Sequence, residues 1–82
     1  MASNLVYCDY KENTADTVTY LYGGDYEDVT GIIVFHFKDD VIEIVKDPDV
    51  ESAPMHHIKR LYGAQRENFK TGIFKKKISY ES

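Results

Sequence analysis

The chain has 82 residues, of which 43% are hydrophobic and 13% aromatic, a composition too apolar for a disordered protein. Its longest uninterrupted apolar run, Ile32 to Phe35, is too short to cross a bilayer, and no stretch matches a secretion signal. The single cysteine, Cys8, excludes an internal disulfide. We therefore expect a soluble, cytoplasmic protein that forms one domain over residues 1–82.

The net charge of −4 hides a division along the chain. Residues 1–51 contain 12 acidic and 3 basic side chains, a net charge of −9, whereas residues 52–82 contain 2 acidic and 7 basic side chains, a net charge of +5. Two interpretations stay open. The two parts attract each other, within the fold or in a homodimer, or the basic part is a functional surface.

The first half of the chain predicts a pair of strands. Side chains alternate over Leu5–Lys11, and a second run rich in β-branched and aromatic residues covers Thr17–Tyr22. The polar segment 12–16 between them is a turn, so these strands form a hairpin. Two glycines, Gly23 and Gly24, end the second strand, and the acidic segment 25–30 connects it to the next one.

The strongest structural signal is the stretch 31–47, where two β-branched and aromatic runs flank Lys38, Asp39 and Asp40. With Asp39 and Asp40 as a two-residue loop, Phe35 lies opposite Ile44 and His36 opposite Glu43. This register predicts one apolar face formed by Ile33, Phe35, Phe37, Ile42 and Ile44.

A helix is predicted after this hairpin, with Ser52 as its N-cap and Pro54 in its first turn. Three- and four-residue spacing places a set of apolar side chains on one face of the helix: Met55, Ile58, Leu61 and Tyr62. Gly63 is a plausible stop, and we expect a helix followed by a loop in preference to a helix that resumes after Gly63.

The last segment, 70–82, predicts a final strand at a sheet edge, because flanking lysines are a common device against edge-to-edge pairing. The order of elements is therefore β-β-β-β-α-β. This order indicates an α+β fold, a small antiparallel sheet of four to five strands with one helix packed on one face.

The sequence offers few residues for catalysis or metal binding. His56 and His57 are adjacent on the predicted helix and diverge by about 100°, so they do not face one metal ion. His36 and Glu43 suit a surface pair, and Cys8 suits a buried position. We expect no metal, no cofactor and no enzymatic activity.

Our leading hypothesis is a small non-enzymatic interaction protein or inhibitor of bacterial or phage type. It would bind a partner protein through a sheet edge or an acidic, tyrosine-rich surface, because tyrosines are favoured at interfaces. The candidate residues for that surface are Asp25, Tyr26, Glu27, Asp28, Tyr20 and Tyr22.

The alternative is a small nucleic-acid-binding protein that uses its basic C-terminal helix and strand, where cations alternate with aromatic side chains. The residues that would contact phosphates are Lys59, Arg60, Arg66, Lys70, Lys75 and Lys77. No motif of a known nucleic-acid-binding module is present, so a lysine-guarded sheet edge is the simpler interpretation of the same residues.

Overall fold

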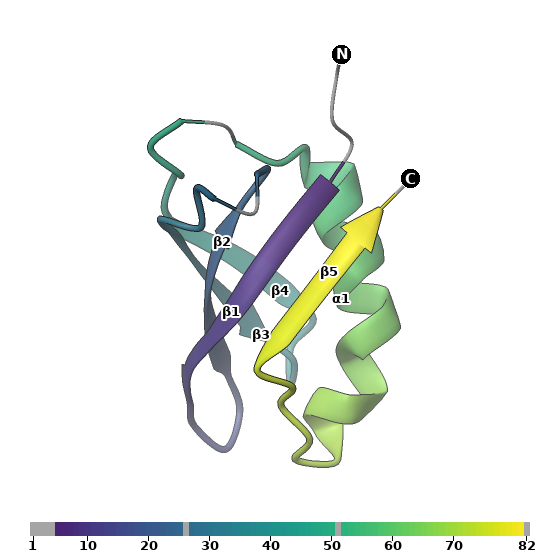
Figure 1. Cartoon of the computed structure of the whole chain (residues 1–82). Helices are drawn as coiled ribbons and strands as arrows, with labels where there is room; N and C mark the ends of the chain where they lie inside the picture. The colour runs from purple at the N-terminus through teal and green to yellow at the C-terminus, as the bar shows by residue number, and fades with distance from the viewer. Residues whose placement is uncertain (1–4, 26, 51, 82) are drawn as a thin grey trace.

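The computed structural model describes residues 5–25, 27–50 and 52–81. One helix lies on one face of a five-stranded antiparallel sheet whose strand order is β4-β3-β2-β1-β5 (Figure 1). The elements are β1 (Leu5–Asn13), β2 (Val18–Gly23), β3 (Gly31–His36), β4 (Val41–Lys46), α1 (Met55–Lys70) and β5 (Lys77–Glu81). The predicted α+β fold and its β-β-β-β-α-β order are confirmed.

The core lies between the sheet and α1, and it is built by the alternation predicted from the sequence. On β2, Val18, Tyr20 and Tyr22 are buried, while Thr19 and Leu21 between them are only half-buried. The same alternation buries Cys8 on β1, and this burial raises the pKa of its thiol, which therefore stays protonated. Among the described residues, no helix combines the length and apolar character needed to span a membrane.

Aromatic rings fill the end of the core that lies beneath the last turn of α1. The ring of Phe69 lies 5.7 Å from that of Phe35 and 6.0 Å from that of Tyr20, measured between centroids. Phe37 and Phe74 contact the same ring at 6.1 Å and 5.9 Å. Phe69 is therefore the residue on which the aromatic cluster converges.

The predicted end of the helix is wrong, because α1 continues through Gly63 to Lys70. Phe69 lies seven residues, or about two turns, beyond Tyr62, so the continuous helix places both rings on the buried face. The burial of Phe69 outweighs the weak helix propensity of Gly63. At the other end of α1, Pro54 is the N-cap instead of Ser52, and Met55 is 42% exposed while His57 is buried.

The predicted register of the β3–β4 hairpin is also wrong, by two residues. Phe35 lies opposite Ile42, and His36 opposite Val41, so the loop contains four residues, 37–40, instead of two. A two-residue loop of the favoured type needs positive φ at both residues, whereas this loop needs it only at Asp40, where φ is 57°. A shift of two residues preserves the faces, so the predicted apolar face is confirmed.

The sheet ends at β4 on one side and at β5 on the other, which confirms the predicted edge position of the last strand. β5 begins only at Lys77, after the exposed Lys75 and Lys76, and β4 has a register irregularity opposite Ile32 and Ile33. Lysines and bulges are both features that discourage pairing with another strand. The two edge strands are therefore poorly suited to pair with a strand of a partner protein.

Candidate functional site

The structure removes two residues, Tyr20 and Tyr22, from the predicted acidic, tyrosine-rich surface. Tyr20 and Tyr22 are 0% and 1% exposed, and the Tyr20 hydroxyl donates a hydrogen bond to the carbonyl of Lys75 at 2.9 Å. Both tyrosines pack into the core because they alternate with residues of the opposite face of β2. Tyr26 lies outside the described residues, whereas Asp25 and Glu27 are exposed.

Asp28 is a structural residue instead of an exposed acid. Its carboxylate accepts hydrogen bonds from the Thr30 hydroxyl at 2.8 Å and from the Val50 N–H at 2.7 Å, and its side chain is largely buried. The Thr30 hydroxyl oxygen in turn accepts the N–H of Asp49 at 2.8 Å. Asp28 therefore holds the β2–β3 connection against the segment that leads into α1.

Two of the six basic candidates form ion pairs with acidic side chains. Arg66 is paired with Asp40 at 2.6 Å, and Lys77 with Asp9 at 3.0 Å. The other four are exposed, three of them on α1 and the last in the connection to β5: Lys59, Arg60, Lys70 and Lys75. Two of the six cations are thus engaged by acids of the first half of the chain, as expected if the two charged parts attract each other within the fold.

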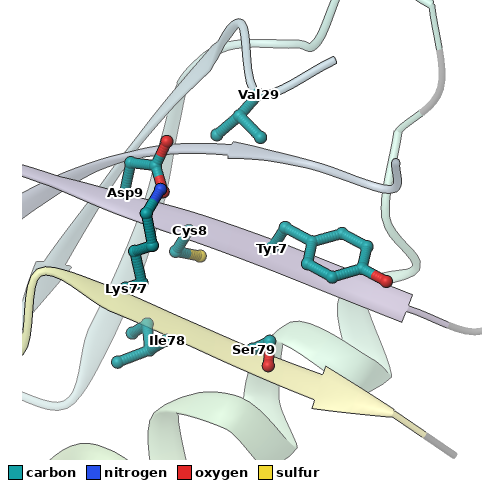
Figure 2. Close-up of a pocket in the computed structure, with 7 residues that line it drawn as sticks. All are labelled: Tyr7, Cys8, Asp9, Val29, Lys77, Ile78 and Ser79. Carbon is teal, nitrogen blue, oxygen red and sulfur yellow. The ribbon is translucent and has the colours of Figure 1, made fainter. Parts of the chain in front are cut away.

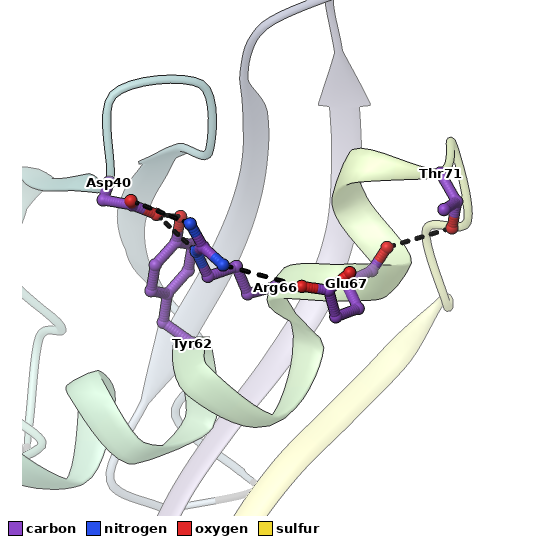
Figure 3. Close-up of polar contacts among 5 residues, drawn as sticks. All are labelled: Asp40, Tyr62, Arg66, Glu67 and Thr71. Carbon is purple, nitrogen blue, oxygen red and sulfur yellow. Dashed lines mark hydrogen bonds and ion pairs between the residues drawn. The ribbon is translucent and has the colours of Figure 1, made fainter.

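The Asp40 side chain ties the β3–β4 loop to α1 (Figure 3). Its carboxylate accepts the Tyr62 hydroxyl at 2.7 Å and two guanidinium donors of Arg66 at 2.6 and 3.1 Å. The hydrogen bonds from Arg66 and then from Tyr62 hold the pKa of Asp40 well below its usual range. Burial and the bond to Asp40 raise the pKa of Tyr62 to about 12.

This cluster predicts an acid-sensitive contribution to stability. Because the pKa of Asp40 is lowered in the folded state, its contribution is fully present above the ordinary aspartate pKa of about 4 and is lost as the pH falls below that value. The Asp40→Asn variant keeps an acceptor and tolerates positive φ. In urea unfolding at pH 7, 5, 3.5 and 2.5, we expect wild type to be more stable at pH 7, and the difference to shrink below pH 4. A difference independent of pH would contradict this assignment.

His56 and His57 differ in burial, although their ring centroids lie 4.1 Å apart. His56 is exposed on α1, whereas His57 is buried against Tyr80 of β5, with ring centroids 5.5 Å apart. Burial, then the charges of His56 and Arg60, lowers the pKa of His57. Within the described ranges, no three His, Cys, Asp or Glu side chains gather in a way that could hold a metal ion.

His36 Nε2 lies 2.9 Å from Glu43 Oε1, so this predicted surface pair is confirmed.

The most distinctive surface is the face of the sheet that points away from α1. Aliphatic side chains from three neighbouring strands lie on it, and we call this set the open face: Leu21, Ile32, Val34, Val41 and Val45. Leu21 is directly opposite Ile32 across the β2–β3 ladder. Val41 and Val45 are 50% and 55% exposed, and the other three are half-buried. Such an apolar patch on a protein surface is typical of an interaction site.

A hollow of about 340 Å³ adjoins the open face over β1 and β5 (Figure 2). The Lys77–Asp9 ion pair crosses it, Tyr7 and Ser79 line its other end, and Val29 of the β2–β3 connection forms one wall. Tyr7 and Ser79 are directly opposite each other across the β1–β5 ladder. The hollow adds a polar rim to the apolar surface, an arrangement common in protein interfaces.

Comparison of the chain with protein-family models, curated proteins and solved structures finds no match.

The open face had a signal in the sequence. The β3 residues Ile32 to Phe35 form a continuous apolar run, which is typical of a strand covered on both faces, whereas strict alternation is typical of one covered on a single face. Leu21, between two buried tyrosines, carries the same signal on β2. The side chains on one side of these strands predict the core. Those on the other side match no motif that predicts a function.

Proposed function

We propose that this protein is a non-enzymatic interaction domain that binds another protein molecule through the open face. The observation that carries the proposal is the set of five aliphatic side chains on neighbouring strands, exposed or half-buried on the side of the sheet opposite α1. Burial of such a surface supplies about 25 cal/mol per Å² of apolar area removed from water.

The charges around the open face support a protein partner over nucleic acid. The Asp9–Lys77 pair lies on the β1–β5 side of the aliphatic residues, whereas the His36–Glu43 pair lies among those of β3 and β4, with Glu43 directly opposite Val34. A nucleic-acid surface needs an excess of positive charge that faces the phosphates, whereas these cationic groups are paired with carboxylates. An apolar centre with a polar, nearly neutral rim fits the anatomy of a protein interface.

Val34→Lys tests this proposal, because it places a charge in the middle of the open face, directly opposite Glu43, where the fold tolerates a lysine. Tagged protein is incubated with a lysate of the organism that encodes the chain. We expect a protein to be retained by wild type and lost with Val34→Lys, with affinity for the purified partner reduced at least about 100-fold, because removing a lysine ammonium group from water in an apolar interface costs several kcal/mol.

The matched control is Ile73→Lys, which introduces the same charge at an aliphatic residue that is 51% exposed in the connection between α1 and β5. This variant should retain the partner. Equal retention by wild type and Val34→Lys would refute the proposal. Salt-sensitive binding of nucleic acid that is lost on Lys59→Ala and Lys75→Ala would favour the alternative function instead.

A further inference from the structure

His57 is a buried polar side chain in the first turn of α1. It is 5% exposed, and its ring lies 5.5 Å from that of Tyr80 on β5, measured between centroids. Its Nδ1 atom is buried and has no hydrogen-bond partner among the described residues. A neutral imidazole carries one N–H, whereas an imidazolium carries an N–H on both ring nitrogens. A proton on the buried ring would therefore leave both a charge and a donor unpaired.

The groups of α1 around His57 oppose a positive charge on it. Burial, and then the charges of His56 and Arg60, lower the pKa of His57, and the ring centroid of His56 lies 4.1 Å away. The first turn of α1 contains no acidic side chain, and the helix dipole places a partial positive charge at this end. A charged His57 would thus be repelled by its own helix.

The two strands packed against this turn present neutral groups to His57. From β5, Tyr80 faces the ring, and from β1 the buried titratable group on this side is Cys8, whose thiol stays protonated. The acids that neighbour them in sequence, Asp9 and Glu81, lie on the other face of the sheet because strand residues alternate. The ring therefore gains a proton most easily by moving into water.

β5 is the element that such a movement would free. It contains five residues and forms the edge of the sheet beside β1, next to α1 (Figure 1). Its inward side chains are Ile78 and Tyr80, which pack on the core below α1. Local opening is concentrated in elements that bury few side chains. Loss of the contact between His57 and Tyr80 therefore weakens a strand that has little else to hold it.

We propose that His57 is a pH-sensitive switch that couples the start of α1 to β5. While the ring is neutral, it stays in the core against Tyr80. When the ring takes a proton from the solvent, it moves into water, and β5 separates from α1 and from β1. The backbone edge of β1 then becomes accessible, and such an edge is the kind with which an extended segment of another protein pairs. This switch lies on the face covered by α1, so it goes beyond the proposed function and does not require the open face.

The switch acts in mild acid. Because the pKa of His57 is lowered in the folded state, the stabilisation from its neutral ring is fully present above the ordinary histidine pKa of about 6.5. It is lost as the pH falls below that value toward the lowered pKa. This range is separate from that of Asp40, whose contribution is lost only below about pH 4.

Hydrogen exchange of the full chain, followed by NMR between pH 7.5 and pH 5.0, tests the inference. Each amide is compared with an unfolded peptide at the same pH, which removes the intrinsic pH dependence of exchange. We expect protection to fall at least about tenfold in β5 and at Ile58, whose N–H bonds to the Pro54 carbonyl at 3.1 Å, and to change little in β2 and β3.

Two variants separate His57 from the other titrating groups. His57→Phe keeps a ring against Tyr80 but takes no proton, so it should abolish the pH-dependent loss of protection. His36→Gln is the matched control, because it removes a histidine that is paired with Glu43 on the opposite face of the sheet, and the loss should persist.

The same NMR spectra follow the ring of His57 in wild type, so the test does not depend on a variant that folds. Its resonances should titrate with a pKa below the ordinary histidine value. The inference is overturned if the ring titrates at or above that value, or if β5 keeps its protection at pH 5.0. Equal losses in wild type and folded His57→Phe, or equal losses in β5, β2 and β3, would overturn it as well.

Discussion

Replacing Phe69 with alanine is expected to lower the free energy of unfolding by about 3–5 kcal/mol. The side chain is 1% exposed, and its ring contacts five other rings: Tyr20 on β2, Phe35 on β3, Phe37 in the β3–β4 loop, Tyr62 on α1 and Phe74 before β5. A domain of this size has a total stability of roughly 4–12 kcal/mol, so the substitution removes a large fraction of it. Urea unfolding at constant protein concentration measures the loss.

Phe69→Leu is the matched variant, because it keeps an apolar side chain of similar volume in the same cavity. It should cost only about 1–1.5 kcal/mol. The comparison separates the loss of packing from a loss of helix propensity, since alanine is the better helix former of the two. A cost below about 1 kcal/mol for Phe69→Ala would mean that α1 does not pack on the sheet beyond Gly63.

Alanine at Gly23 is expected to destabilise the protein by at least about 2 kcal/mol. A Cβ at this position would lie 1.9 Å from the carbonyl oxygen of Asp28 and 2.9 Å from its carbonyl carbon. These are backbone atoms, and the hydrogen bonds of Asp28 hold them in place, so a side-chain rotation cannot relieve the contact. Gly23 is therefore required by the close approach of the β2–β3 connection.

Alanine at Gly63 is the matched control, with the opposite sign. A Cβ there meets nothing within 4 Å, and the residue lies in the middle of α1. We expect a stabilisation of about 0.5–1 kcal/mol, because alanine loses less conformational entropy in a helix than glycine does. Thermal or urea unfolding of both variants checks the pair. Similar effects at the two positions would contradict the contacts described for Gly23.

The sequence predicted most of the architecture because the inward-facing residues follow the period of each element. Alternation identified the β-strands, and three- and four-residue spacing identified the first two turns of α1 as a helix. Its errors arose where local signals competed with distant contacts. Gly63 signals a helix end, yet Phe69 packs among rings from β2 and β3 and stabilises the part of α1 beyond Gly63. Asp39 and Asp40 suggest a tight turn, yet Asp40 bonds to Tyr62 and Arg66 on α1 and fixes a longer loop.

The residues of the candidate site were harder to predict from the sequence than the fold was. Tyrosines beside acidic residues suggested an interaction surface, but alternation on β2 places Tyr20 and Tyr22 in the core, as the same period already implied. The open face combines Leu21 with residues eleven to twenty-four positions later in the chain, and only the strand order makes them neighbours. The hollow likewise joins β1 to β5, which are the first and last strands in the chain.

The amino-acid sequence by itself determined the α+β class, the order of elements and the apolar face of each strand, because these depend on the local period of hydrophobic residues. Only the tertiary structure decided where α1 ends, which residues form the β3–β4 loop and which face of the sheet is left open. Those features depend on contacts between residues far apart in the chain, whose energies outweigh a turn preference or the helix propensity of a single glycine. The open face, on which the proposed function rests, belongs to this second group.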